Sequence, residues 1–166
     1  GKAPVLGWVH GGGYAVGSAN ERVLQSGAFA ASGIVEVTLN YRLGALGVLH
    51  LDDAPDNRGL LDIIRALQWV RDNIAGFGGD PARVTLAGRS AGGFAVATLM
   101  AMPEAQGLFS RALIQSGATP AVLPMHCAQR TTERFLSRLG IKASALETAD
   151  LTQILNAQKQ ICDESY

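Results

Sequence analysis

Short apolar runs alternate with longer segments of helical spacing along this chain. Each apolar run is bounded by glycine, proline or polar turn residues and has the length of a buried strand. The longer segments repeat apolar residues every three or four positions, as amphipathic helices do. We therefore predict strands at residues 4–10, 34–41, 83–88 and 111–117, and helices at residues 21–32, 60–74, 91–102, 126–139 and 148–159. This alternation predicts an α/β fold with a parallel sheet and right-handed crossovers, in one domain that spans residues 1–166.

The helix at residues 60–74 has the clearest pattern, because glycines end it and one stripe of it is apolar: Leu60, Ile63, Ile64, Leu67, Val70 and Ile74. Trp69 lies on this helix and Trp8 on the first strand, so we expect both rings to pack in the core. Glu36 is unexpected within the strand at residues 34–41, because a carboxylate is costly to bury.

Composition narrows the classes of function. Hydrophobic residues make up 48% of the chain and charged residues 17%, which is typical of a soluble globular protein. Lys plus Arg and Asp plus Glu balance at 14 each, so no field favours nucleic acid or an anionic membrane as partner. No apolar stretch is long enough to span a bilayer.

The first ten residues lead directly into a strand pattern rather than a signal peptide, so we expect the chain to begin inside a fold. Cys127 and Cys162 lack any metal-ligand spacing. Two free or buried thiols are the favoured interpretation, and a single disulfide stays open. Because a disulfide would indicate an oxidising compartment, the cellular location of the chain stays open as well, with the cytoplasm favoured.

A serine stands at a predicted strand-to-helix turn, in Gly88-Arg89-Ser90-Ala91-Gly92. This is a G-x-S-x-G pattern, in which small neighbours permit a strained turn and the hydroxyl projects from the carboxyl end of the sheet. The glycines could also serve only to make a tight turn, or to bind phosphate at a helix N-terminus. The strand before the turn and the helix after it favour a nucleophilic serine.

A second glycine-rich loop, "HGGGY" at residues 10–14, also follows a predicted strand. Successive glycines let backbone N–H groups point into a cavity, where they can stabilise an oxyanion, typically by about 3–4 kcal/mol for each donor. We expect Gly12, Gly13 and the amide of Ala91 to form such an oxyanion hole. Either loop alone could be structural, but the two together favour acyl-transfer chemistry.

These motifs, in this order, resemble the type-B carboxylesterases, the carboxylesterase and cholinesterase group of the α/β-hydrolase fold. The resemblance rests on "WVHGGGYAVGS", "NYRLGALG", "NRGLLDIIRALQWVRDNIAGFGGDPARVTLAGRSAGG" and "ALIQSG", and continues weakly into "RFLSRLGI". It implies the central part of an α/β-hydrolase fold, incomplete at both ends. A mostly parallel sheet would carry helices on both faces, with the strands at 34–41 and 111–117 outermost. It also implies hydrolysis of small-molecule carboxylic esters through an acyl-Ser90 intermediate, without cofactor or metal.

The resemblance further implies roles for residues outside the two loops. Arg42 of "NYR" would form a structural ion pair with Asp80 of "GGDP", although Asp80 could equally be only a turn residue. Arg89 and Tyr14 would line the substrate pocket. Members of the family commonly carry Glu or Gln where this chain has Arg89, so a preference for cationic, choline-like substrates is not expected.

The base that would activate Ser90 is missing from the expected place. In α/β-hydrolases the acid and then the histidine follow the serine. After Ser90 there is a single histidine, His126. The acid of the triad should come before the histidine, whereas five carboxylates come after it: Glu133, Glu147, Asp150, Asp163 and Glu164. His10 is expected to be a wall residue of the oxyanion loop, and His50 a loop residue. We therefore expect the acid and histidine to lie outside this chain, which alone would be inactive.

Three further interpretations remain open for this chain. A metal site at Asp52, Asp53 and Asp56 is less favoured than a solvated turn. A cholinesterase-like adhesion or scaffold domain would keep the fold without the chemistry, but such domains generally lose the serine that this chain retains. A free-standing inactive fragment is the third. In the fragment interpretation, the rest of the enzyme or a second copy covers the apolar sheet edges "VEVTL" and "ALIQ".

Overall fold

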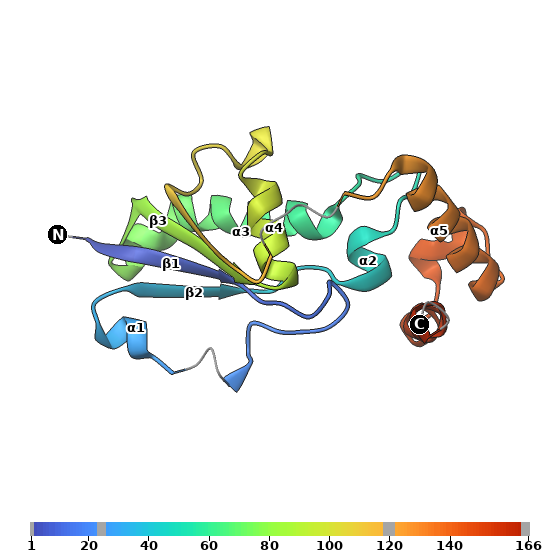
Figure 1. Ribbon diagram of the computed structural model, residues 1–166, viewed down its shortest axis with the longest axis horizontal. Helices are drawn as coiled ribbons and strands as arrows, with labels where there is room; N and C mark the ends of the chain where they lie inside the picture. Colours follow the sequence, from blue (N-terminus) through green and yellow to red (C-terminus); the bar gives the residue numbers. More distant parts are fainter. Residues whose placement is uncertain (1, 23–25, 118–121, 164–166) are drawn as a thin grey trace.

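A parallel four-stranded sheet forms the centre of the molecule (Figure 1). The computed structural model describes residues 2–22, 26–117 and 122–163. The strands are β1 (Ala3–Val9), β2 (Val35–Leu39), β3 (Gly79–Arg89) and β4 (Arg111–Gln115). All neighbouring pairs are parallel and the strand order is β2-β1-β3-β4. The predicted parallel sheet, with its second and fourth strands outermost, is confirmed.

Six helices accompany the strands in the described part of the chain: α1 (Ala28–Ala31), α2 (Gly44–Val48), α3 (Arg58–Asn73), α4 (Ala91–Leu99), α5 (Met125–Leu139) and α6 (Leu151–Asp163). Short 3-10 helices add η2 (Ile74–Phe77), η3 (Pro103–Ala105) and η4 (Ala143–Thr148). Of the helix predicted at 21–32, the described residues show α1, and the apolar residues Val23 and Leu24 lie outside the described residues. The sequence pattern did not predict α2.

The core lies between the sheet and helices α3 and α4. Alternate residues of β1 and β3 face this layer, as strand geometry requires. The buried side chains that meet there include Val5, Val9, Val84, Leu86, Ile63, Leu67, Val70, Ala95 and Leu99. Helices α3 and α4 therefore pack on the same face of the sheet. The opposite face carries half-buried side chains such as Leu6 and Trp8, and in the described residues no long helix packs there.

Trp69 departs from the expectation that it would pack in the core. Its side chain is 49% exposed and rests against exposed Phe77, with the ring centroids 5.8 Å apart. The buried stripe of α3 runs through Leu67 and Val70, and one residue along a helix rotates the side chain by about 100°. Trp69 therefore stands beside the stripe. The prediction for Trp69 was wrong, and Trp8 is half-buried.

The edge strands explain the polar residue in β2. Because β2 is outermost, Glu36 keeps access to water, and its carboxylate accepts a hydrogen bond from the Ala30 N–H at 3.3 Å. At the other edge, β4 is exposed along most of its length, and Leu113 is 46% exposed. Within the described residues, no further strand pairs with either edge. The partner expected there stays a prediction.

Helices α5 and α6 form a second, smaller core beyond the carboxyl ends of the strands (Figure 1). Leu49, Phe135, Ile154 and Ala157 are buried together. The Ala45 N–H at α2 donates to Gln158 Oε1 of α6 at 2.9 Å. No helix in the described part of the chain is long and apolar enough to cross a membrane.

Candidate active site

The turn between β3 and α4 places Ser90 in a strained conformation. Its backbone angles are φ 55° and ψ −122°, in the region that side-chain-bearing residues rarely adopt. Two hydrogen bonds hold the turn: the Ser90 N–H donates to the Gln115 carbonyl at 2.8 Å, and the Phe94 N–H donates to the Ser90 carbonyl at 2.9 Å. The residue is exposed. Its hydroxyl therefore projects from the end of the sheet toward solvent.

The small residues of the turn are required by close backbone contacts. A Cβ on Gly92 would collide with the Val9 carbonyl oxygen of β1. A Cβ on Gly93 would come 2.8 Å from the Gln115 carbonyl oxygen of β4. Helix α4 thus begins directly against two neighbouring strands, which fixes the position of Ser90 relative to both.

The glycine loop that follows β1 rests against this turn. A Cβ on Gly11 would lie 2.8 Å from the Arg89 carbonyl oxygen and 3.3 Å from Ser90 Cβ. Gly12 and Gly13 then adopt positive φ values of 113° and 62°. In the described residues, the N–H groups of Gly12 and Gly13 donate to no protein acceptor, and neither does that of Ala91, the first residue of α4. The glycine loop therefore contacts the serine turn at Gly11, and three amides of the two loops have no partner in the described residues.

His10 is buried behind the glycine loop. Its ring is 1% exposed and stacks on Tyr41, with the ring centroids 4.6 Å apart. The His10 Nδ1 lies 2.8 Å from the Gly11 carbonyl oxygen, and the Tyr41 hydroxyl donates to the His10 carbonyl at 2.8 Å. Burial, with a smaller effect of Tyr14, raises the pKa of Tyr41 to about 12, so its hydroxyl stays a neutral donor.

No histidine of the described residues is hydrogen-bonded to Ser90. His10 has the partners given above. His50 lies between two carboxylates, with Nδ1 2.8 Å from Asp56 and Nε2 3.4 Å from Asp52. The hydrogen bond to Asp56 is the main cause that raises the pKa of His50. His126 is exposed in the first turn of α5, beyond the end of the sheet (Figure 1).

The predicted ion pair of Arg42 with Asp80 is wrong. The Arg42 guanidinium instead binds Asp62 of α3 through two bonds, from Nε at 2.8 Å and Nη2 at 2.7 Å, and the Arg42 N–H adds a third at 2.9 Å. Asp80 accepts a bond from the Ala82 N–H at 3.0 Å, as a turn residue does. Arg42 pairs with Asp62 because α3 places the Asp62 carboxylate beside the segment that leaves β2.

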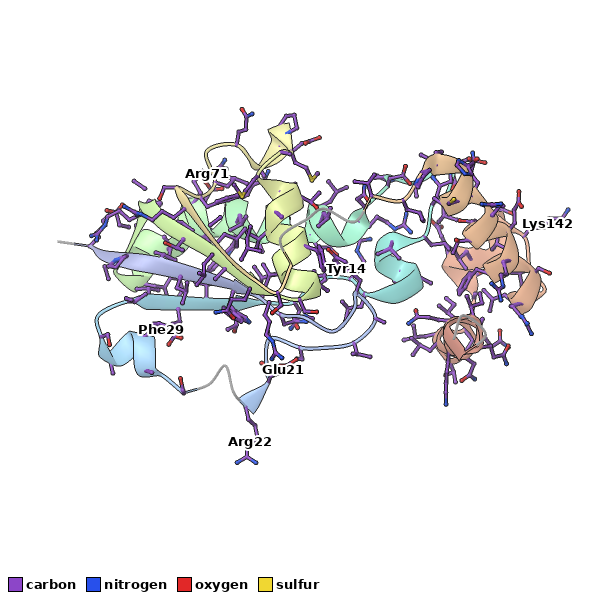
Figure 2. All side chains as sticks on the ribbon, in the orientation of Figure 1. Tyr14, Glu21, Arg22, Phe29, Arg71 and Lys142 are labelled. Atoms are coloured by element: carbon purple, nitrogen blue, oxygen red, sulfur yellow. The ribbon has the colours of Figure 1, made fainter. Side chains whose placement is uncertain are left out.

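The two predicted pocket residues, Arg89 and Tyr14, come from different parts of the chain. Arg89 is the last residue of β3, is exposed and forms no ion pair within the described residues. Tyr14 is half-buried, has a positive φ of 59° and packs against the core. Its carbonyl accepts the Gly44 N–H at 2.6 Å, and Figure 2 shows it between the ends of the strands and α2. Burial raises the pKa of Tyr14.

Sequence reasoning missed three residues beside the site. Tyr41 and Asp62 anchor the loops after β1 and β2. Ser116 follows β4 with φ 55°, next to the carbonyl that holds the Ser90 N–H. The strand pattern contained a signal for Tyr41 and Ser116, because both lie at the carboxyl ends of the strands predicted at residues 34–41 and 111–117.

Other candidate features lie elsewhere. A shallow hollow lined by Leu99, Gln106 and Arg111 is at the amino end of β4, away from Ser90. Across residues 2–22, 26–117 and 122–163, no group of three or more His, Cys, Asp or Glu side chains is placed to hold a metal ion. Cys127 is a free thiol that accepts a hydrogen bond from Arg130 at 3.3 Å. The side chain of Cys162 lies outside the described residues.

Comparison with known proteins gives one consistent family. A family model described as "Carboxylesterase family" matches residues 1–162. A para-nitrobenzyl esterase of Bacillus subtilis is 44% identical over 95% of the chain and 34% of its own length. A probable N-octanoylanthranilate hydrolase of Rhodococcus erythropolis is 46% identical over 95% of the chain and 35% of its own length.

Solved structures agree with these matches. A PNB esterase superposes with a TM-score of 0.92 at 44% identity, over 96% of this chain and 36% of that one. The juvenile hormone esterase of Manduca sexta gives a TM-score of 0.91 at 33% identity, over 98% of this chain and 33% of that one. The chain therefore has the fold of these esterases and spans about a third of their length.

Proposed function

Because the chain belongs to the carboxylesterase family, we propose that it forms the nucleophile-bearing part of a serine carboxylic-ester hydrolase. The observation that carries this proposal is the contact between the two loops. The Gly11 backbone rests against Ser90, and the amides of Gly12, Gly13 and Ala91 have no protein acceptor in the described residues. Ala91 is buried and Gly12 half-buried, so an unpartnered amide is costly at these two positions, whereas Gly13 is exposed to solvent. An oxyanion is a ligand that all three N–H groups could bind.

The proposed reaction proceeds in two halves. Ser90 Oγ attacks the carbonyl carbon of the ester while a base accepts its proton, and the amides of Gly12, Gly13 and Ala91 stabilise the oxyanion. The intermediate then breaks its bond to the alcohol, which leaves with that proton, and an acyl-Ser90 ester remains. Water attacks this ester in the same way, which releases the carboxylic acid and restores the Ser90 hydroxyl.

The base belongs to a part of the enzyme outside these 166 residues. Three histidines occur in the chain, and none is hydrogen-bonded to Ser90 in the described residues. A serine hydroxyl needs a positioned base, which in turn needs an acid to orient it. We therefore propose that both come from the remaining length of the fold, which the esterase relatives possess and this chain does not span.

Small-molecule carboxylic esters are the proposed substrates. Among the relatives, the name para-nitrobenzyl esterase specifies an ester, whereas N-octanoylanthranilate is an amide, and both names describe release of an acyl group. The chemistry needs no cofactor. The competing proposal, an inactive scaffold domain, is less well supported because Ser90 and both oxyanion elements are retained.

Active-site labelling tests the proposal in the complete protein. We expect a fluorophosphonate probe to label the wild type at Ser90 and to leave the Ser90→Ala variant unlabelled, because only this hydroxyl is activated. Ser144→Ala is the matched control, since Ser144 is an exposed serine of η4. Persistent labelling of Ser90→Ala would show that another residue is the nucleophile, and an unlabelled wild type would support the scaffold.

A further inference from the structure

His10 makes one hydrogen bond with its side chain, and the direction of that bond is determined. Its Nδ1 lies 2.8 Å from the Gly11 carbonyl oxygen. A carbonyl oxygen can only accept, so Nδ1 carries the proton of this hydrogen bond. The Nε2 of the same ring is buried and has no partner in the described residues.

The Gly11 carbonyl is coupled to the proposed oxyanion hole through a rigid peptide unit. The C=O of Gly11 and the N–H of Gly12 belong to the same planar, trans peptide, so they point in opposite directions. A bond that holds this carbonyl toward His10 therefore directs the Gly12 N–H away from His10. Tyr41 holds the preceding carbonyl, that of His10, in the same manner at 2.8 Å.

Without such bonds the loop would have little to fix it. Glycine adopts either sign of φ with similar ease, and the loop contains three glycines in succession. Gly12 itself has φ 113°. We propose that His10 is a positioning residue: its Nδ1–H fixes the Gly11–Gly12 peptide so that the Gly12 amide faces the substrate oxygen. This inference rests on the proposed function.

Packing alone does not account for a histidine at this position. The ring stacks on Tyr41 and lies against Gly17, contacts that a phenylalanine ring could also make. A phenylalanine would moreover avoid the buried, unpaired Nε2, which lowers stability. The property that histidine adds here is the Nδ1–H donor. A packing role and a positioning role of His10 therefore differ in one hydrogen bond, that from Nδ1–H to the Gly11 carbonyl.

Two substitutions separate the donor from the ring, and both belong in the complete protein. His10→Phe keeps an aromatic ring against Tyr41 and removes the donor. His10→Asn removes the ring and retains an N–H at the position of Nδ1. We expect His10→Phe to lower kcat by about 10- to 100-fold with KM within about threefold, because an oxyanion donor acts mainly in the transition state. We expect His10→Asn to recover most of kcat at a lower melting temperature.

A purely structural role predicts the reverse order of activity, with His10→Phe fully active and His10→Asn impaired, and that result would overturn the inference. If His10→Asn does not fold, His10→Phe decides alone: wild-type kcat overturns the inference and a selective loss of kcat supports it. His10→Leu, which also lacks the donor, replaces His10→Phe should that variant not fold. Wild type and Ser90→Ala are assayed in parallel. An inactive wild type overturns the proposed function itself, whereas an active wild type with unaffected His10→Phe overturns only the role of His10.

Discussion

Ser90 is held in its strained conformation by neighbours that are mostly backbone. A residue in such a φ/ψ region costs on the order of 1–3 kcal/mol, so the surrounding contacts must over-determine it. The bond to the Gln115 carbonyl, the first helical bond from Phe94 and the absence of a Cβ at Gly92 and Gly93 do so here. The backbone of Ser90 is thereby held in place by the protein itself.

Arg89 places a cation beside this serine, and its effect on substrate preference can be measured. Two unit charges about 6 Å apart at an effective dielectric of about 20 interact by on the order of 3 kcal/mol before screening. Exposure and salt reduce this to about 1 kcal/mol, or roughly fivefold in kcat/KM. We expect neutral or anionic esters to be preferred over a choline-type ester, and Arg89→Glu to reverse the ratio.

The control for Arg89→Glu is Arg83→Glu, which makes the same charge change on an exposed residue of the same strand, distant from the serine. The pair is compared by kcat/KM for a cationic ester and its neutral isostere. A wild type that prefers the cationic ester would contradict the prediction for Arg89.

At the scale of elements, the loop after β2 is tied to α3 by the ion pair of Arg42 and Asp62. The pair is bidentate, and its side chains are 49% and 27% exposed. Burial alone would raise the pKa of Asp62, but the hydrogen bonds and charge of Arg42 outweigh it and lower the pKa below the ordinary value of 3.8. The carboxylate therefore stabilises the fold in its ionised form.

This lowered pKa gives a pH-dependent prediction for Asp62→Asn. The stabilisation is present above the unfolded-state pKa near 3.8 and is lost as pH falls through the lower folded-state pKa. We expect Asp62→Asn to reduce the free energy of unfolding by about 1 kcal/mol near pH 7, and by progressively less below pH 4. Thermal melts across this range provide the measurement.

Asp72→Asn serves as the control, since Asp72 pairs with its exposed neighbour Arg71 at 2.7 Å within one helix. Its effect should be smaller at every pH. A destabilisation by Asp62→Asn that stays constant down to pH 3 would show that the ion pair is not its cause.

Periodicity predicted the four strands because a buried strand leaves a regular apolar trace, and the family resemblance implied which of them lie outermost. It could not choose between two acids for Arg42, since the choice depends on which carboxylate α3 or β3 brings alongside. Trp69 was misplaced because it adjoins a buried stripe, where one step of helical rotation decides exposure. The five-residue α2 is too short for any period to show. The serine turn could be predicted from the sequence because its glycines are required by backbone contacts close to them in the chain and in the neighbouring strands.

For the molecule as a whole, much apolar surface is exposed in the described residues. Both edge strands lack a partner on their outer side, one sheet face is only half-buried, and Leu113, Trp69 and Phe77 are exposed. Unpaired edges present N–H and C=O groups that recruit other chains. A larger enzyme would cover these surfaces with its own segments.

The isolated 166-residue chain should therefore self-associate and should not turn over esters. Oxyanion stabilisation and binding alone retain only about 10³–10⁴-fold over water in a triad enzyme, far below full activity. Sedimentation velocity and an ester assay test both parts, and Leu113→Lys, which charges the β4 edge, should weaken the association. A monodisperse monomer whose turnover is abolished by His10→Ala or His126→Ala would contradict this prediction.

The strand order has a consequence for how the chain is made. Of these four strands β1 leaves the ribosome first, yet it ends up between β2 and β3, and Val5 pairs with Val84 far along the chain. Synthesis proceeds at about 5–20 residues per second, so β1 and β2 wait on the order of seconds before β3 emerges. During that interval their apolar face is open to chaperones and to other nascent chains. Because strand pairing in small α/β domains takes about milliseconds to a second once the strands are present, the arrival of β3 sets the pace at which β1 can complete its pairing.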